Sequence, residues 1–257
     1  MVTGTRIALI VEYDGTRYHG SQLQAGSPTV QGVIEGALCK LTGENIRVRM
    51  AGRTDAGAHA RGQVVNFGTE SPLPTETFIK GLNFHLPGDV AVKEAYKVDN
   101  LFDARRNALS REYKYYIWNS PIRSPIRRNF VYLVSKKLDM EAINRAAQAL
   151  IGKHDFASFV TRTEIGKKST IRNIYKAELE KDGDLVILTM VANAFLPHQV
   201  RNTAGALIKV GLGKMTVEEF ESIIEAKKPG MAGPTAPACG LCLMKVIYPE
   251  PFGRDTQ

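Results

Sequence analysis

The chain has 257 residues, and a hydrophobic content of 44% is enough for folded cores, which excludes a disordered protein. It carries 34 Lys and Arg against 26 Asp and Glu, a formal net charge of +8, so a polyanion is the first partner to consider. Three cysteines are too few for a disulfide scaffold, and no stretch has the length of a membrane span. We therefore expect a soluble cytoplasmic protein, with a membrane surface as a weaker alternative partner.

Hydrophobic periodicity predicts a mixed unit in the N-terminal part of the chain. Strands are expected at residues 5–13, 46–50, 62–67 and 90–98, with a turn at residues 14–16 and helices at residues 28–43 and 75–84. The first helix is expected to open at Pro28 and to stop at Gly43. In the strand at residues 46–50, apolar side chains alternate with arginines, which predicts one apolar and one basic face.

The rest of the chain predicts a second unit of similar make-up. Strands are expected at residues 110–118 and 241–248, a hairpin at residues 175–191, and helices at residues 139–151 and 196–210 and after Thr216. Asp139 is the expected cap of its helix, with Ile143, Ala147, Leu150 and Ile151 facing inward. Together the units predict an α+β fold, divided into residues 1–105 and 106–257, with a cleft between related halves.

Residues 52–60, GRTDAGAHA, place a single carboxylate, Asp55, on a glycine-flanked turn between Arg53 and Arg61. Nearby positive charge favours the ionised form of a carboxylate, and an ionised carboxylate can act as a nucleophile or a base. On local pattern alone, such a turn is more often a surface bend whose carboxylate pairs with arginine. The rest of the chain has to decide between these two interpretations.

Basic residues are grouped rather than scattered, as is typical of phosphate binding. A solvated face is the plain alternative for any single group, but four groups and the net charge together favour nucleic acid. The groups are Arg47, Arg49, Arg53 and Arg61; Arg105, Arg106 and Arg111; Arg123, Arg127 and Arg128; and Arg162, Lys167, Lys168 and Arg172.

Residues 111–116, REYKYY, interleave tyrosines with cations in a predicted strand. Tyr113 and Tyr115 share one face of that strand, and Tyr116 takes the other. A base could stack on one of these rings, but half-buried tyrosines are ordinary strand residues, and spacing alone does not choose.

Cys239 and Cys242 have the spacing of half a zinc site or of a thiol-redox pair. A zinc site needs a second pair of ligands, which the sequence lacks. A redox pair would open a helix, whereas these cysteines lead into a predicted strand, so we do not favour either role. The sequence has no phosphate loop, dinucleotide fingerprint or serine-hydrolase elbow. The candidate chemistry therefore uses one carboxylate, arginines and aromatic rings, without a metal or a cofactor.

These motifs resemble the tRNA pseudouridine synthases of the TruA type, and the resemblance spans nearly the whole chain. The strongest match is residues 52–60, which places the catalytic aspartate of the family on Asp55. Supporting matches follow in the family's order at residues 13–16, 29–32, 102–105, 111–113, 152–156, 195–202 and 237–241.

The resemblance implies a fold of two related α/β units with antiparallel sheets side by side and the active site between them. It implies a homodimer that acts on uridines in the anticodon stem-loop of tRNA without a cofactor. The reaction breaks the C1′–N1 glycosidic bond, turns the base and rejoins it through C5. Because the target lies within a stem, the nucleotide must be flipped out.

The resemblance also implies roles for particular residues. Asp55 would attack or deprotonate the target nucleotide, and Arg201 would pair with its carboxylate. Tyr113 would stack on the flipped uracil, with a further role in moving its proton, and Leu241 would pack against that base. Arg53 would fill the site of the displaced base or contact the adjacent phosphate. The expected RNA contacts are Arg61, Arg105 and Arg111.

Three positions depart from the family pattern: Ser21 replaces a large aromatic residue, Ala58 replaces valine, and Gln199 replaces methionine. We expect Ser21 to lie in a loop near RNA, so its change bears on substrate contacts rather than on chemistry. The main rival interpretation is an RNA-binding module without catalysis, which would use the same basic groups and tyrosines.

Overall fold

The computed structural model describes residues 4–160 and 169–249, so Arg162, Lys167 and Lys168 of the fourth basic group lie outside the described residues. Within that range the chain forms ten strands and five α-helices, which confirms the predicted mixed fold. Two compact units are present: the first runs to Leu109 and resumes at Leu243, and the second comprises Ser110–Cys242. The predicted division is into residues 1–105 and 106–257. The observed units differ from it mainly because most of the last strand belongs to the first unit.

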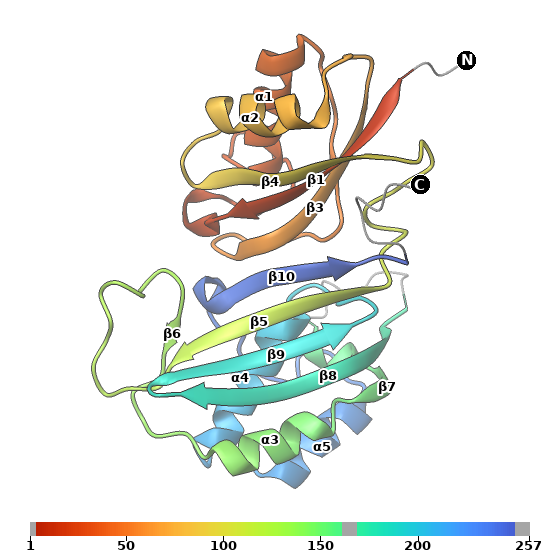
Figure 1. The fold of residues 1–257 in the computed structure, drawn as a ribbon. Helices are drawn as coiled ribbons and strands as arrows, with labels where there is room; N and C mark the ends of the chain where they lie inside the picture. Colours follow the sequence, from red (N-terminus) through yellow and green to blue (C-terminus); the bar gives the residue numbers. More distant parts are fainter. Residues whose placement is uncertain (1–3, 161–168, 250–257) are drawn as a thin grey trace. The chain divides into compact units, whose positions relative to one another are not determined.

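The first unit is a sheet with two helices on one face (Figure 1). Strand β1 (Thr5–Tyr13) lies between β3 (His59–Thr69) and β4 (Val90–Val98), antiparallel to both. On the far side of β3 lies β10 (Leu241–Ile247), most of which belongs to this unit. The helices are α1 (Val30–Thr42) and α2 (Thr75–His85), and β2 (Arg49–Met50) pairs with β3.

The strands at residues 5–13 and 90–98 and the helix at residues 75–84 are confirmed by β1, β4 and α2. Helix α1 stops at Gly43 as predicted, but it begins at Val30 rather than Pro28, because the Thr29 side chain accepts the Gly32 N–H as a cap. Of the strand predicted at residues 46–50, only Arg49 and Met50 form a strand, because only these two residues pair with β3. Ile46 and Val48 are nevertheless buried, and Arg47 and Arg49 are exposed, as the alternation predicts.

In the second unit, three helices cover one face of an antiparallel sheet (Figure 1). The strand order is β5 (Ser110–Trp118), β9 (Leu185–Ala192), β8 (Ile171–Asp182) and β7 (Gly152–Asp155), and β6 (Tyr132–Leu133) runs parallel to the end of β5. The helices are α3 (Met140–Gln148), α4 (Gln199–Gly211) and α5 (Val217–Ala226).

The strand at residues 110–118 and the hairpin are confirmed, and Gly183 adopts a positive φ of 57° in the hairpin turn. Helix α3 is capped by Asp139 as predicted but ends at Gln148. Ile151 therefore lies beyond the helix and is 41% exposed, so its predicted inward position is wrong. Helix α4 begins at Gln199 rather than Leu196.

The longest described helices, α1 and α4, have 13 residues each. In the part of the chain that the structure describes, none has the length and apolar character needed to cross a membrane.

The capping box of α5 yields a stability prediction. Thr216 accepts the Glu219 N–H at 3.1 Å, and Glu219 accepts the Thr216 N–H at 2.8 Å. Thr216→Ala removes the first of these bonds and should lower the free energy of unfolding by about 1 kcal/mol in urea titrations. Thr75→Ala is the control, because α2 has no side-chain cap bond, and it should change stability by less than about 0.5 kcal/mol. Equal losses in both variants would contradict the capping role.

Candidate active site

Asp55 lies on a β-turn between β2 and β3. The Ala58 N–H donates to the Asp55 carbonyl at 3.1 Å, and Gly57 has a φ of 79°, a conformation that the third residue of a type II turn requires. The Asp55 side chain is half-buried, and Arg53 is exposed. The predicted turn is therefore present, with its carboxylate at the margin of the solvent.

The residue before Asp55 is bonded through its amide, its carbonyl and its hydroxyl. The Thr54 N–H donates to Ser21 Oγ at 2.8 Å, and the Thr54 carbonyl accepts the Ser21 N–H at 3.0 Å. The Thr54 hydroxyl lies 2.8 Å from the Tyr13 hydroxyl. Ser21 is fully buried, so its own side chain is shielded from solvent, and the expected position of its loop near RNA stays a prediction.

The other side of the turn is held by Tyr18. Its carbonyl accepts the Gly57 N–H at 3.3 Å, and its hydroxyl donates to Asp89 Oδ1 at 2.6 Å. Arg17 also donates to Asp89, with Nε 2.7 Å from Oδ2. Burial alone would raise the pKa of Asp89, but the hydrogen bonds from Tyr18 and Arg17 outweigh it and place the pKa below its ordinary value.

The start of the Asp55 segment is fixed by a glutamine of β3. Gln63 Nε2 donates to the Gly52 carbonyl at 2.8 Å, and Gln63 Oε1 accepts the Gly52 N–H at 3.2 Å. Gln63 is fully buried. Hydrogen bonds therefore hold the segment at Gly52, Thr54 and Gly57, on both sides of the carboxylate.

A close backbone approach explains the glycine in the segment predicted as a turn at residues 14–16. This segment forms η1 (Gly15–Arg17), and a Cβ on Gly15 would lie 1.8 Å from the Ala58 carbonyl oxygen. The Gly15 N–H donates to His59 Nδ1 at 3.1 Å, and the same nitrogen lies 3.2 Å from Asp14 Oδ1.

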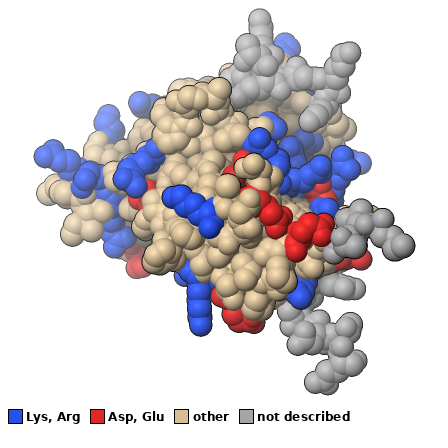
Figure 2. Space-filling model, turned by 90° about the horizontal axis from the view of Figure 1, so that it is seen from above, with Lys and Arg blue, Asp and Glu red and all other residues tan. Residues whose placement is uncertain are grey.

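The first basic group divides into paired and exposed arginines. Arg47 pairs with Glu35 at 2.9 Å, and Arg49 pairs with Asp103 at 2.8 Å. Arg53 and Arg61 are exposed, and no ion pair involves them within residues 4–160 and 169–249. On the face drawn in Figure 2, lysine and arginine side chains stand out over much of the surface, and acidic side chains gather in fewer places.

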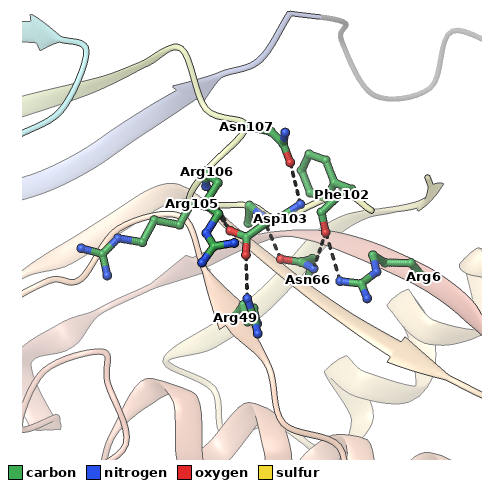
Figure 3. Close-up of polar contacts among 9 residues, drawn as sticks. Arg6, Arg49, Asn66, Phe102, Asp103, Arg105, Arg106 and Asn107 are labelled. Atoms are coloured by element: carbon green, nitrogen blue, oxygen red, sulfur yellow. Dashed lines mark hydrogen bonds and ion pairs between the residues drawn. The ribbon is translucent and has the colours of Figure 1, made fainter. Parts of the chain in front are cut away.

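Asp103 organises the loop that carries Arg105 and Arg106 (Figure 3). Its Oδ1 accepts the backbone N–H groups of both arginines, at 2.9 and 3.0 Å, while its Oδ2 pairs with Arg49. Burial raises the pKa of Asp103, but these hydrogen bonds and the Arg49 charge reverse the effect, so the net shift is downward. The carboxylate stays ionised and presents two exposed arginine side chains.

Asn66 of β3 fixes the same loop from the sheet. It donates to the Phe102 carbonyl at 3.1 Å and accepts the Ala104 N–H at 2.9 Å, and Arg6 donates to the Phe102 carbonyl at 3.0 Å (Figure 3). The Tyr248 hydroxyl donates to the Ala104 carbonyl at 2.6 Å. Residues 102–105, which resemble a motif of the family, therefore form a loop of the first unit that is held by several hydrogen bonds.

In the second unit, the tyrosines of β5 differ in exposure. Tyr115 is fully buried and donates to the Pro237 carbonyl at 2.7 Å, so it cannot stack on a base. Tyr113 is 7% exposed, and its ring meets that of Phe195 at 5.2 Å and 87°. The sequence analysis did not predict this contact, because Phe195 and Tyr113 are distant in sequence and such a contact has no periodic signal.

Arg201 lies in the first turn of α4. Its Nε donates to the Ala236 carbonyl at 2.8 Å, and its own carbonyl accepts the Ala236 N–H at 3.2 Å. Gln199, which replaces the family's methionine, is fully buried and accepts the Leu196 N–H at 2.8 Å. His198, the cap residue directly before α4, has a positive φ of 54°, an uncommon conformation for a residue other than glycine.

The other predicted residues of this unit are buried. Arg111 is 8% exposed and donates to the Asn193 carbonyl at 2.9 Å, which leaves little of its side chain for solvent. Leu241, at the start of β10, is 6% exposed. The predicted site residues are therefore divided between the units. The first unit contains Arg53, Asp55, Arg61 and Arg105, and the second contains Arg111, Tyr113, Arg201 and Leu241.

The third basic group lies on an arm between β5 and β6, which we define as residues 119–131 and which contains no acidic residue. Arg123, Arg127 and Arg128 are all exposed. The Arg127 guanidinium lies 5.2 Å from the Trp118 ring centroid, and Arg128 donates to the Pro125 carbonyl at 2.8 Å. These contacts order the arm without neutralising its charge.

The cysteines lack the surroundings of a reactive pair. Cys239 and Cys242 are free thiols, and burial raises the pKa of Cys239, which disfavours the reactive thiolate. The Cys239 Sγ lies 3.5 Å from the Val131 carbonyl. In the described ranges, no three His, Cys, Asp or Glu side chains come together as metal ligands could.

The sequence matches a protein family described as tRNA pseudouridine synthase over residues 9–106 and 146–249, which is more than half of the chain. The chain belongs to this family. The reaction class of the tRNA pseudouridine synthase family, isomerisation of uridine in tRNA, is the one that the sequence analysis predicted.

Several proteins named tRNA pseudouridine synthase A are similar over almost their full length. The protein of Legionella pneumophila (strain Corby) is 43% identical over 248 residues, which cover 96% of this chain and 94% of the relative. That of Pelobacter propionicus is 42% identical over 242 residues, covering 94% and 99%. A Neisseria meningitidis serogroup C relative is 43% identical over 249 residues, covering 96% and 94%.

The hydrogen bonds that Asp89 accepts from Tyr18 and Arg17, next to the Asp55 turn, can be tested by varying the pH. Its pKa is lowered in the folded protein, so its stabilisation is present above the ordinary carboxyl range and is lost as the pH falls through the folded pKa. Asp89→Asn should lower the free energy of unfolding by about 1 kcal/mol at neutral pH, and the deficit should narrow below about pH 4.

Chemical denaturation at both pH values measures this deficit. Glu221→Gln, at an exposed position of α5, is the control and should show no such dependence. A deficit that stays constant or widens in acid would contradict the assignment.

Proposed function

We propose that the protein converts uridine to pseudouridine in the anticodon stem-loop of tRNA, with Asp55 as the catalytic carboxylate. The observation that carries this proposal is the Asp55 turn, whose backbone is bonded at Gly52, Thr54 and Gly57. Catalytic groups need such fixed positions, because small displacements of a reacting group cost large factors in rate. The match of residues 52–60 to the family motif supports the same residue.

The proposed chemistry is an isomerisation, so it needs no oxidant, reductant or transferred group. The C1′–N1 bond breaks, the base turns, and a bond forms between C1′ and C5. The proton on C5 leaves to solvent and N1 takes up a proton, so the product is an isomer of the substrate. Asp55 acts either on C1′ as a nucleophile or on a sugar proton as a base. The reaction as written therefore requires no cofactor.

Other residues take the roles that the family resemblance implies. Arg201 pairs with the Asp55 carboxylate, Tyr113 stacks on the flipped uracil, and Leu241 packs against that base. The contact with Phe195 supports the role of Tyr113, because it fixes the plane of the tyrosine ring. Arg53 fills the place of the displaced base or contacts the phosphate beside it.

Exposed arginines supply the phosphate contacts. Arg53, Arg61 and Arg105 have exposed side chains on the first unit, and the arm of residues 119–131 adds three more on the second. Arg111 donates to a backbone carbonyl and is proposed as a weaker RNA contact. Assembly as a homodimer and a cytoplasmic location remain part of this proposal.

Asp55→Asn tests the catalytic role. The variant should release hydrogen from C5 of uridine in tRNA no faster than a protein-free control, because an amide is neither a nucleophile nor a base. Its affinity for tRNA should stay within about threefold of the wild type, since the phosphate contacts are intact. Asp99→Asn, an exposed aspartate of the same unit, is the matched control and should retain activity.

The same assay separates the enzyme from its main rival. A protein that binds tRNA but releases no hydrogen from C5, even as the wild type, would be an RNA-binding module. Activity that persists in Asp55→Asn would sink the assignment of Asp55. Pseudouridine mapping of the treated tRNA would identify the modified positions and test the anticodon stem-loop.

Neutralising the arm tests its contact with RNA. The triple variant Arg123→Ala, Arg127→Ala and Arg128→Ala should bind tRNA more weakly whatever the RNA sequence. The magnitude of the slope of log affinity against log salt concentration should fall by about 2 to 3. At saturating tRNA, kcat should be unchanged, because no arm residue takes part in the reaction. Lys176→Ala, which removes a cation paired with Glu178, should leave the slope nearly unchanged. An unaltered slope in the triple variant would remove the arm from the binding surface.

A further inference from the structure

We propose that Ser21 is a positioning residue of the active site, whose hydroxyl sets the backbone immediately before Asp55. This inference rests on the proposed role of Asp55. The residue is one of the three departures from the family pattern, where a large aromatic side chain is usual, and its hydrogen bond to the Thr54 amide requires a short hydroxyl side chain. It is therefore a property of this chain rather than of the motif.

Ser21 holds the Thr54 peptide from both sides. The Ser21 hydroxyl accepts the Thr54 N–H at 2.8 Å, and the Ser21 N–H donates to the Thr54 carbonyl at 3.0 Å. These bonds fix the orientation of the peptide units on either side of the Thr54 Cα. Because Asp55 follows directly, they also restrict the position of its Cα, from which the carboxylate extends.

The position of Ser21 is set in turn by the first turn of α1. The Gln31 N–H donates to the Ser21 carbonyl at 3.0 Å, and the Val30 N–H donates to the Gly20 carbonyl at 3.3 Å. These N–H groups have no acceptor inside the helix, so the loop satisfies them. Hydrogen bonds therefore link α1 through Ser21 to Thr54, the residue that directly precedes Asp55.

The approach between the two segments is too close for a larger residue. Gly20 has a φ of 92°, and a Cβ there would lie 2.9 Å from the Thr54 carbonyl oxygen. The Ser21 side chain is fully buried, so an aromatic ring in its place would have to displace the surrounding residues. The burial also excludes direct contact of the Ser21 hydroxyl with RNA.

Ser21→Ala removes the hydroxyl with the smallest change of volume. We expect kcat for pseudouridine formation to fall roughly 10- to 100-fold, because the carboxylate loses its set position. The KM for tRNA should stay within about twofold, since the phosphate contacts are unaffected. Ser21→Thr keeps the hydroxyl and should restore kcat to within about threefold of the wild type, even where the added methyl group lowers its melting temperature.

Thr69→Val is the matched control at the opposite end of β3. Thr69 is also buried, and its hydroxyl accepts the Ser71 N–H at 3.1 Å and donates to Glu44 at 2.8 Å. The substitution should lower the melting temperature without lowering kcat. A purely structural role for Ser21 predicts that both variants lose stability and that both keep kcat.

The outcomes separate this inference from the proposed function. If Asp55→Asn is inactive and Ser21→Ala keeps kcat within about twofold of the wild type, the positioning role is wrong and the catalytic role stands. If Ser21→Thr is as slow as Ser21→Ala while folded, or if Thr69→Val loses as much kcat, the hydroxyl of Ser21 is not the cause. If Asp55→Asn is active, the proposed function fails first.

Discussion

The first turn of α1 has backbone N–H groups that no residue inside the helix can accept, and the first unit is arranged around this constraint. The carbonyls of Gly20 and Ser21 satisfy two of these groups, which brings the segment after β1 against the segment before β3. Tyr13, Tyr18 and Ser21 then bond to the residues that flank Asp55. The helix that covers the sheet is therefore also the support of the carboxylate.

Two carboxylates of the first unit accept backbone N–H groups of loops as well as pairing with arginines. Asp103 accepts backbone N–H groups of Arg105 and Arg106, and Glu35 accepts the Val48 N–H at 3.0 Å while it pairs with Arg47. Each of these carboxylates is mostly shielded, with 14 to 16% of its side chain exposed. These carboxylates accept hydrogen bonds from backbone N–H groups, and the side chains of Arg105 and Arg106 remain exposed to solvent. The negative charges of Asp103 and Glu35 are therefore already engaged within the protein.

Local pattern is sufficient to predict most of the regular elements, although several of their ends are misplaced, and the roles of the site residues stay a prediction. The strands of residues 5–13, 90–98 and 110–118 have signals that lie within a few neighbouring residues, and so does the turn at Asp55. The burial of Ser21, the contact of Phe195 with Tyr113 and the exposure of Ile151 depend on residues distant in sequence. The start of α1 was misplaced for a related reason, since the choice between Pro28 and Thr29 depends on which side chain reaches the Gly32 N–H.

The last strand has a consequence for how the protein matures during synthesis. The first unit is built from residues up to Leu109 and from Leu243 onward, and the Leu109 N–H donates to the Ile247 carbonyl at 2.8 Å. When the ribosome has completed Leu109, β3 still lacks its β10 neighbour, and the whole second unit is translated before that neighbour emerges. Domains tend to fold in the order in which they leave the ribosome. Here the half that carries the proposed catalytic aspartate starts first and is finished last, so the nascent chain exposes an open sheet edge until its final strand arrives.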